Sequence, residues 1–574
     1  MIYHAPEILK KANTWLSPEF DDDTQQAIKE LIAHNPEELS DCFYKNLEFG
    51  TGGMRGIMGV GTNRINKYTL GKNTQGLSNY LKQQFPDQQL RVAIAYDCRH
   101  NSQSLAQLVA TVFSANGIEV FLFSELRPTP ELSFAVRHLN CQCGIVLTAS
   151  HNPPEYNGYK VYWEDGGQLV PPHDKAIIEE INNLAFSDVA FEGEANLITL
   201  IDQEIDTAFI NASVATIDFG LSEKIKNDLH IVFTSLHGTS ITLVPDTLRQ
   251  AGFAKLDIVE EQAVPDGNFP TVASPNPEEQ AALKMALELG EKVGADIVIG
   301  TDPDCDRLGI AVRDDQNRLT ILNGNQTMIL MTDALLSRYS ENGFNQNEFV
   351  GSTIVSTPMM DILTHSYGVE CKTALTGFKW IAKMIEDYPN QKFIGGGEES
   401  YGYMVGDFVR DKDAVTATLL ACTVAAAAKA EGITLFEKLK TLYLKHGYYK
   451  EVLIAMVKKG QSGAQEIQEI MNTLRQSPLQ EINGDPVVRV EDYQSSEALD
   501  LTTHQKSAIS IPKSNVLIYY TANGSKIAAR PSGTEPKIKF YISVNTALPD
   551  LASYDKITAE LDARIDGIKN ALGV

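Results

Sequence analysis

The sequence predicts an α/β protein with three related α/β domains, each containing a mixed or parallel sheet, and a smaller C-terminal α+β domain. The length of 574 residues exceeds what one hydrophobic core usually organises. Three segments repeat a strand–helix–strand order with short connections, which is the pattern of a parallel βαβ unit. The C-terminal segment instead carries a hairpin signal, which is typical of antiparallel strands.

The three repeats share their helix signals as well as their order. Apolar residues recur at helical spacing after the first strand, and a glycine closes each helix, at Gly117, Gly252 and Gly368. In the third repeat Thr357 is the predicted N-cap, with Pro358 at the first helical position. The six predicted strands are 91–96 and 118–123, 230–234 and 255–259, and 349–355 with a partner that begins at Val369.

The C-terminal segment has a different pattern. Asn523-Gly524 separates two β-rich runs and is a type I′ hairpin signal. The predicted strands are 516–521, 526–530 and 537–544. Together with the repeats, this segment predicts domains at 1–205, 206–322, 323–455 and 456–574.

Composition restricts the class of partner. The net charge of −25 argues against nucleic acid and anionic membranes. Surface charge is screened beyond about 8 Å at physiological salt, so a pocket with local cations can still bind an anion. The longest apolar stretch, 415–428, is too short to cross a bilayer and predicts a buried helix. No signal-peptide pattern and no redox or zinc spacing among the seven cysteines is visible, so we expect a cytoplasmic protein with reduced thiols.

In open α/β sheets ligands bind beyond the carboxyl ends of the strands, so the loops that follow strands are the candidate sites. In the first such loop, 148–160, Ser150 and His151 lie where an apolar strand ends. A predicted turn at Asn157-Gly158 brings Lys160 back toward them. A serine beside His and Lys can be a nucleophile or a carrier, or simply part of a polar turn. No glycine stands two positions before or after Ser150, which argues against a hydrolase elbow.

The second loop carries three carboxylates at alternate positions, Asp302, Asp304 and Asp306, after another apolar strand. In an extended loop these side chains project to one side, where a hard divalent cation can collect them. The loop is not an EF-hand, because Arg307 and Arg313 occupy the positions of the Gly and the final Glu. Two alternatives stay open: a solvated acidic loop, and the nucleophilic aspartate of a haloacid-dehalogenase-type phosphatase.

Two further loops offer polar groups beside glycines. The loop 395–403 lets the backbone approach a ligand, and Glu398 and Ser400 provide acceptors and a donor suited to sugar hydroxyls. The segment 530–536 presents Arg530, two hydroxyls and a tight turn, which suits a phosphate. An ordinary type I turn explains the same segment equally well.

Together these motifs resemble those of the α-D-phosphohexomutases, the family of phosphoglucomutases and phosphomannomutases. The resemblance covers nearly the whole chain, and the motifs stand in the family's order. They are FGTGGMRG at 49–56, TASHNP at 148–153, DPDCDR at 302–307, GEES at 397–400 and RPSGTEP at 530–536. The resemblance implies four domains around a central cleft, with one loop from each.

The resemblance also implies roles for individual residues. The implied catalytic residues are Ser150, which is phosphorylated, and Arg55, His151, Lys160 and Lys412. The implied ligands of Mg²⁺ are Asp302, Asp304 and Asp306, with an oxygen of phosphorylated Ser150. The implied substrate-binding residues are Arg307, Thr376, Gly377, Lys379, Glu398, Ser400, Arg530, Ser532, Gly533 and Thr534. Either His151 or Lys160 is the general base.

The implied activity is that of a mutase, an isomerase that moves a phosphoryl group on a small sugar phosphate. We expect interconversion of glucose 1-phosphate and glucose 6-phosphate through phosphoserine and a bisphosphorylated sugar, with glucose 1,6-bisphosphate as the priming intermediate. Phosphopentose and phosphomannose are alternative substrates; a sugar-phosphate phosphatase and an inactive sugar-phosphate-binding protein are alternative classes. We expect a monomer or small homo-oligomer, whose C-terminal domain opens and closes between half-reactions.

Overall fold

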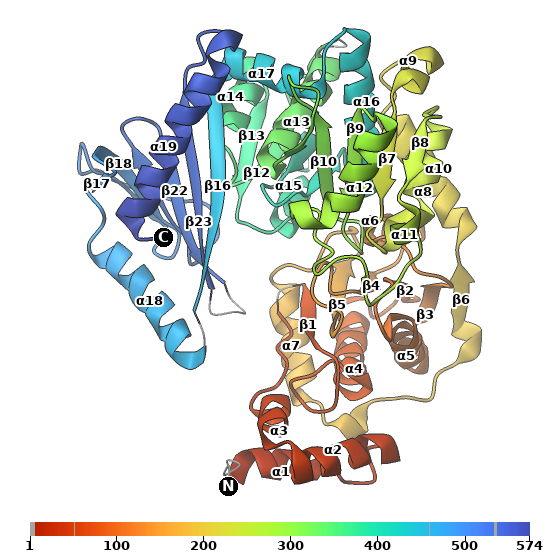
Figure 1. The fold of residues 1–574 in the computed structure, drawn as a ribbon. Coiled ribbons are helices and arrows are strands. Elements are labelled where there is room, and N and C mark those ends of the chain that lie inside the picture. Colours follow the sequence, from red (N-terminus) through yellow and green to blue (C-terminus); the bar gives the residue numbers. More distant parts are fainter. Residues whose placement is uncertain (1–5, 51, 342, 459, 533–536) are drawn as a thin grey trace.

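The computed structural model describes residues 6–50, 52–341, 343–458, 460–532 and 537–574, and Figure 1 labels its elements. Three α/β units, each with one sheet, follow one another along the chain. An eight-stranded sheet with its own helices forms a C-terminal unit at one side of the molecule (Figure 1). This arrangement confirms the predicted fold class.

The first sheet has six strands in the order β1-β5-β4-β2-β3-β6. Its central strands are parallel, whereas β1 and β5 are added antiparallel at one edge. The predicted strand 91–96 is β2 residue for residue. The strands are β1 (Gly53–Ile57), β2 (Arg91–Tyr96), β3 (Glu119–Phe123), β4 (Cys143–Leu147), β5 (Tyr156–Trp163) and β6 (Ile198–Ile201). The helices are α4 (Lys67–Gln84), α5 (Ser102–Ala115), α6 (Thr129–His138) and α7 (His173–Asn183).

The second and third sheets repeat this plan with fewer strands, in the orders β11-β10-β9-β7-β8 and β13-β12-β14-β15. Each has a parallel centre and one antiparallel edge. The second contains β7 (Ile231–Thr234), β8 (Leu256–Ile258), β9 (Ile297–Thr301), β10 (Leu308–Arg313) and β11 (Leu319–Leu322), with α8 (Gln203–Thr216), α9 (Glu223–Asp228), α10 (Val244–Gln250), α11 (Glu260–Ala263) and α12 (Gln280–Val293). The third contains β12 (Glu348–Thr353), β13 (Glu370–Ala374), β14 (Lys392–Gly397) and β15 (Tyr403–Val405), with α13 (Gly324–Glu341), α14 (Met359–Ser366), α15 (Lys379–Asp387), α16 (Ala414–Ala430) and α17 (Leu435–His446).

The fourth sheet is antiparallel, and its first strand, β16, pairs along its whole length with β23. Its strands are β16 (Tyr448–Val457), β17 (Glu481–Ile482), β18 (Asp485–Asp492), β19 (Glu497–Asp500), β20 (Lys506–Ala508), β21 (Leu517–Thr521), β22 (Lys526–Pro531) and β23 (Lys537–Thr546). Its helices are α18 (Gly460–Gln476) and α19 (Tyr554–Leu572).

The predicted hairpin is present between β21 and β22, but the predicted type I′ turn is wrong. That turn needs positive φ at both central residues. Only Gly524 has it, with φ 79°. The connection is longer than two residues, because Thr521 N donates to Ser525 O at 3.0 Å and closes a wider loop.

Two other local predictions are corrected by one to three residues. α14 begins at Met359, one residue later than predicted, although the Thr357 hydroxyl still accepts from Met359 N at 3.3 Å. β14 continues through Gly397, so Gly395–Gly397 belong to the strand and not to the loop. These glycines pair with β12 and β15, and glycine is needed at 396 because a Cβ there would lie 2.3 Å from Gly351 O on β12.

The N-terminal helices α1 (Pro6–Thr14), α2 (Asp22–His34) and α3 (Pro36–Phe43) precede the first sheet and lie at one end of the molecule (Figure 1). Trp15 is 1% exposed and contacts the rings of Phe20, Phe43 and Tyr68. Because Tyr68 belongs to α4, this aromatic cluster attaches the helices to the first α/β unit.

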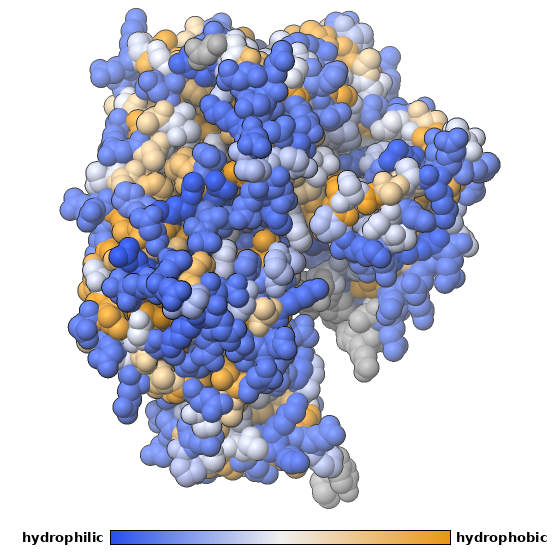
Figure 2. All heavy atoms as spheres, turned by 180° about the vertical axis from the view of Figure 1, so that it is seen from behind, coloured by the Kyte–Doolittle hydropathy of each residue, from blue (hydrophilic) through white to orange (hydrophobic). Residues whose placement is uncertain are grey.

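The surface turned away from the view of Figure 1 is mainly hydrophilic, with hydrophobic residues scattered in small groups (Figure 2). Among the described residues, no single helix combines the length and apolarity needed to span a membrane. The pair α16 and α17 meets both criteria together, but the two helices bend by 86° at the break between them. α16 is the predicted apolar helix, and most of its residues are buried.

Candidate active site

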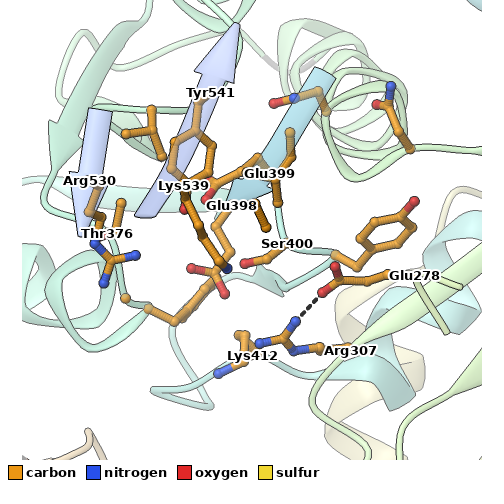
Figure 3. A pocket seen from close by; sticks show the side chains of 18 of the residues that line it. Glu278, Arg307, Thr376, Glu398, Glu399, Ser400, Lys412, Arg530, Lys539 and Tyr541 are labelled. Atoms are coloured by element: carbon orange, nitrogen blue, oxygen red, sulfur yellow. Dashed lines mark hydrogen bonds and ion pairs between the residues drawn. The ribbon is translucent and has the colours of Figure 1, made fainter. Parts of the chain in front are cut away.

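Loops and strands from all four sheets line one cleft of about 680 Å³ (Figure 3). The predicted site residues that line it are Arg55, Ser150, His151, Lys160, Asp306, Arg307, Thr376, Gly377, Glu398, Ser400, Lys412 and Arg530. Asp302 and Asp304 are 0% exposed and lie beneath the cleft surface. Lys379 instead lines a smaller cavity with Trp163 and His173. Ser532 follows β22, and Gly533 and Thr534 lie outside the described residues.

Ser150 follows β4 and is held in an unusual backbone conformation. Its φ is 52°, in the left-handed region that non-glycine residues seldom adopt. Its hydroxyl donates to Asp302 Oδ2 at 2.7 Å and lies 3.2 Å from His151 Nδ1. The side chain of a residue from the first unit is thereby placed directly against the acidic loop of the second.

Asn157 and Gly158 do not form the predicted turn, because both lie inside β5. Glycine is required there by a close approach. A Cβ on Gly158 would lie 2.4 Å from Thr148 O and 2.9 Å from Met54 O. β5 then carries Lys160 into the cleft as a strand residue.

The three aspartates of the metal-type loop form one buried cluster. Each offers a carboxylate oxygen within 4.8 Å of the others. Asp304 Oδ1 and Asp306 Oδ1 are buried and accept no hydrogen bond from any described residue. The loop is a turn and not the predicted extended segment: Cys305 has φ 58° and its N–H donates to Asp302 O at 2.9 Å. Three buried carboxylates, two of which have an oxygen without a hydrogen bond from the described residues, fit a hard divalent cation.

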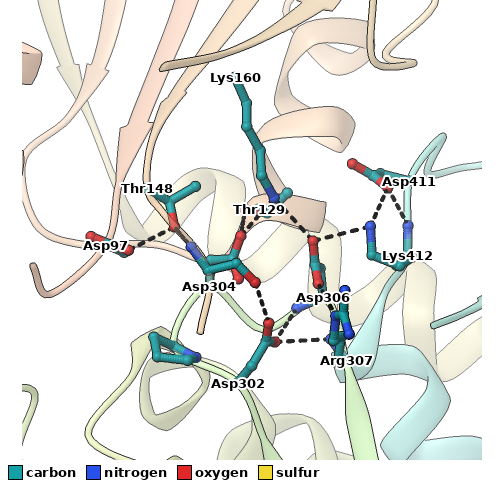
Figure 4. Close-up of polar contacts among 12 residues, drawn as sticks. Asp97, Thr129, Thr148, Lys160, Asp302, Asp304, Asp306, Arg307, Asp411 and Lys412 are labelled. Atoms are coloured by element: carbon teal, nitrogen blue, oxygen red, sulfur yellow. Dashed lines mark hydrogen bonds and ion pairs between the residues drawn. The ribbon is translucent and has the colours of Figure 1, made fainter. Parts of the chain in front are cut away.

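Two lysines from other units neutralise this cluster (Figure 4). Lys160 Nζ lies 2.7 Å from Asp304 Oδ2 and 3.0 Å from Asp306 Oδ2. Lys412 Nζ lies 3.1 Å from Asp306 Oδ2 and 3.3 Å from Asp411 Oδ1. The cluster therefore joins the first, second and third units through charge.

The surrounding charges shift the pKa values of Asp302 and Asp306 in opposite directions. Burial and the charges of Asp304 and Asp306 raise the pKa of Asp302 well above its ordinary value. Burial also acts to raise the pKa of Asp306, but Lys160, Lys412 and Arg307 outweigh it and lower the pKa. The cluster thus holds an ionised carboxylate beside a carboxyl group that retains a proton more readily.

His151 and Lys160 are shifted in opposite directions. Burial, Arg307 and Arg55 lower the pKa of His151 well below its ordinary value, so the imidazole is neutral at neutral pH. Burial acts to lower the pKa of Lys160, but Asp304 and Asp306 outweigh it and raise the pKa. His151 is therefore able to accept a proton, whereas Lys160 is a cation.

The loop after β14 contributes an acidic group to the cleft. Glu398 is 5% exposed, and burial raises its pKa to about 7, with Lys412 opposing the shift. Gly402 makes room for the lysine, since a Cβ there would lie 2.2 Å from Lys412 Cδ. Glu398 and Ser400 both line the cleft (Figure 3).

Several cleft residues were missed from the sequence. Glu278 pairs with Arg307, and Lys537 and Lys539 lie on β23 beside the strand of Arg530. The lysines carried a usable signal: residues two apart in the predicted strand 537–544 point to the same face. Glu278 ends a family-like run, 275–278, but the run assigns it no role, because its contact with Arg307 joins two loops of the second unit.

The site combines a serine at a strand end, a buried tri-aspartate cluster and a basic group on the opposite wall, which defines a protein that binds small phosphorylated ligands. Sequence patterns of phosphoglucomutase/phosphomannomutase α/β/α domains I, II and III match residues 46–188, 207–316 and 323–445. The chain belongs to the phosphoglucomutase/phosphomannomutase family, as the resemblance predicted.

Relatives extend the match over nearly the whole chain. Phosphoglucomutase from Staphylococcus aureus strain MRSA252 is 38% identical over 558 residues, which cover 94% of this chain and 97% of that protein. The protein of the same description from strain MSSA476 is 38% identical over 555 residues, with the same coverage.

Solved structures share the fold at low identity. Parafusin, a phosphoglucomutase from Paramecium in an open form, has a TM-score of 0.68 at 19% identity and covers 92% of this chain and 96% of its own. A phosphoglucomutase/phosphomannomutase family protein from Burkholderia thailandensis has a TM-score of 0.64 at 17% identity, with 91% and 97% covered.

Proposed function

We propose that the chain is a phosphoglucomutase that interconverts glucose 1-phosphate and glucose 6-phosphate through a phosphoserine at Ser150. The observation that carries the proposal is the 2.7 Å contact between Ser150 Oγ and Asp302 Oδ2, at the floor of a cleft whose far wall is basic. The 38% identity to curated phosphoglucomutases over 94% of the chain favours glucose as the sugar.

Each half-reaction is one phosphoryl transfer. The bond from phosphorus to Ser150 Oγ breaks while a bond forms to the free hydroxyl oxygen of the sugar phosphate. The hydroxyl proton moves to His151, whose neutral ring lies 3.2 Å from Ser150 Oγ and can return a proton to that oxygen. The bisphosphate then reverses its orientation and returns its other phosphate to Ser150.

Cations of the cleft act on the transferring group. Lys160 and Arg55 line the cleft near Ser150, and Arg55 is held by a 2.9 Å hydrogen bond to Asn152 Oδ1. Lys412 lies on the other side of Asp306. Positioning and charge neutralisation are the main means by which phosphoryl transfer is accelerated.

Asp302, Asp304 and Asp306 are the residues that would hold Mg²⁺, together with an oxygen of phosphorylated Ser150. The two buried carboxylate oxygens without a hydrogen bond from the described residues support this assignment. Bound Mg²⁺ would neutralise charge on the phosphoryl oxygens.

The opposite wall suits the parts of the substrate that do not react. Glu398 and Ser400 would bind sugar hydroxyls, with Thr376 and Gly377 beside them. Arg530, Lys537 and Lys539 would bind the second phosphate, helped by Ser532 and by Gly533 and Thr534 outside the described residues. A second binding place for phosphate supports a mutase over a phosphatase.

The test is a coupled assay of glucose 1-phosphate conversion with Mg²⁺ and catalytic glucose 1,6-bisphosphate. We expect turnover by the wild type, loss of turnover in Ser150→Ala, and little change in Ser235→Ala, a buried serine after β7 of the second sheet. Turnover of ribose or mannose phosphates in place of glucose phosphates would show that the substrate is a different sugar phosphate. Release of inorganic phosphate at the rate of substrate loss would establish a phosphatase.

A further inference from the structure

We propose that Asp97, Arg99 and Thr148 form a closed ring of polar contacts that fixes Ser150, and that Arg99 and Thr148 are positioning residues for phosphoryl transfer. The inference rests on the proposed function. It starts from topology: β2 and β4 are parallel neighbours, with Tyr96 opposite Leu147. The turns that follow them therefore lie side by side, and one holds Asp97 and Arg99 while the other holds Thr148 and Ser150.

The ring binds both backbone groups of Ser150. Its N–H donates to Thr148 Oγ1 at 2.9 Å, and that hydroxyl donates to Asp97 Oδ2 at 2.7 Å (Figure 4). The same Asp97 oxygen lies 3.3 Å from Arg99 Nε. Arg99 Nη2 then donates to the carbonyl of Ser150 and closes the ring.

Arg99 also holds the rest of the serine loop. Nη2 donates to Asn152 O, and Nη1 donates to Pro153 O at 2.8 Å and to Tyr156 O at 3.1 Å. The side chains of Arg99 and Asp97 are 0% exposed. One buried planar guanidinium thus satisfies four carbonyls of the serine loop, which the single ammonium of a lysine cannot reproduce.

This restraint has a mechanical reason. Ser150 has φ 52°, which a non-glycine residue keeps only when its surroundings impose it. The ring restrains the N–H before that torsion and the carbonyl after it. If it is weakened, the backbone is free to relax toward ordinary φ, and Ser150 Oγ leaves its position against Asp302.

The second α/β unit packs against the same ring of polar contacts. The centre of the phenyl group of Phe269 lies 5.1 Å from Arg99 Cζ. A Cβ on Gly267 would lie 2.8 Å from His100 N and 3.0 Å from Arg99 Cα. Because this unit also carries Asp302, the contact that seals Arg99 helps to set the distance between the serine and the acidic cluster.

Two variants test the ring of polar contacts, and they remove different numbers of its contacts. Arg99→Lys keeps the positive charge beside Asp97 and removes the planar guanidinium with its several N–H donors. Thr148→Val keeps the shape and removes the hydroxyl that links Ser150 N to Asp97. The matched control is Arg313→Lys: Arg313 is also buried and donates to three carbonyls, of Gly290, Ala295 and Asn317, away from the cleft.

The readouts separate positioning from folding and from binding. Intact-protein mass follows the rate at which Ser150 gains phosphate from glucose 1,6-bisphosphate, and calorimetry gives the Kd of glucose 6-phosphate. We expect phosphate loading to slow about 100-fold in Arg99→Lys, because an error of about 1 Å in a reacting group has that effect. We expect phosphate loading to slow about tenfold in Thr148→Val, because one hydrogen bond is lost. The Kd stays within about threefold, since neither residue lines the cleft.

Loading at the wild-type rate in both variants would overturn the inference. So would equal losses of loading and binding that Arg313→Lys reproduces, because the effect would then be structural only. If Arg99→Lys does not fold, Thr148→Val decides alone by the same criteria. A wild-type protein that neither gains phosphate nor converts sugar phosphates would instead overturn the proposed function, and the inference with it.

Discussion

Lys160 Nζ lies 2.7 Å from Asp304 Oδ2, although Lys160 belongs to β5 of the first sheet and Asp304 follows β9 of the second. The carboxylate is 0% exposed, so the ammonium balances a charge that water cannot reach. The contact joins the unit that carries Ser150 to the unit that carries the acidic cluster.

Replacing Lys160 should impair catalysis. We expect Lys160→Met to lower kcat/KM roughly 100- to 1,000-fold, the usual effect of removing one group that stabilises transition-state charge. Steady-state kinetics measures the loss. The control is Lys440→Met, since Lys440 is also mostly buried and pairs with Asp315 away from the cleft. Kinetics within fivefold of the wild type in Lys160→Met would refute the assigned role.

The acidic cluster should determine metal affinity. We expect Asp304→Asn to weaken Mg²⁺ binding at least about tenfold by calorimetric titration. Asp246→Asn, at an exposed position on α10, should leave the Kd unchanged. Chelation should abolish wild-type turnover, and added Mg²⁺ should restore it. Equal Mg²⁺ affinity in both variants would place the metal elsewhere.

Gly238 should be required for the shape of the metal-type loop. A Cβ at this position would lie 2.4 Å from Pro303 Cα, which is backbone and has no flexible end that can move aside. We expect Gly238→Ala to destabilise the protein by about 1–3 kcal/mol and to weaken Mg²⁺ binding. Thermal unfolding and calorimetry measure the two effects. Gly567→Ala serves as the control, because the three atoms nearest to a Cβ there all belong to the flexible side chain of Asn483. Equal effects of the two substitutions would contradict this role of Gly238.

Asp413 should make stability depend on pH. It accepts hydrogen bonds from Val415 N and Thr416 N at the start of α16, and burial raises its pKa from 3.8 to about 6. The folded state therefore binds the proton more tightly than the unfolded chain. The burial of its charge is unfavourable above about pH 6, and stability falls as the pH rises from about 4 to 6.

The variant Asp413→Asn keeps the cap and removes the titration. By scanning calorimetry we expect its Tm to exceed that of the wild type by about 2 °C at pH 7.5, with the difference vanishing near pH 4. Asp555→Asn, exposed in the first turn of α19, should show no such trend. A difference independent of pH would refute the assignment.

The sequence predicted the parts of the fold that depend on local pattern. β2 and the apolar helix α16 follow directly from burial and periodicity. Long-range packing decided the rest. Gly158 looked like a turn residue, but it lies inside β5, where Thr148 O and Met54 O leave no room for a side chain.

In the candidate site, too, residues in local motifs were predicted and residues that depend on long-range contacts were missed. Ser150 and the three aspartates were predicted because each stands at a strand end in a recognisable motif. Glu278 was missed because only the folded chain brings it to Arg307. The Asp97–Arg99 ring was missed for the same reason, since its contacts to the serine loop span about fifty residues of sequence.

Tandem mass spectrometry shows most directly whether Ser150 carries the phosphate. The protein is incubated with glucose 1,6-bisphosphate, digested and sequenced, before and after a second incubation with excess glucose 6-phosphate. We expect one added phosphate on Ser150 that is discharged in the second step, and no such label in Ser150→Ala. Phosphate on another residue, or a Ser150 phosphate that sugar phosphate does not remove, would contradict this expectation.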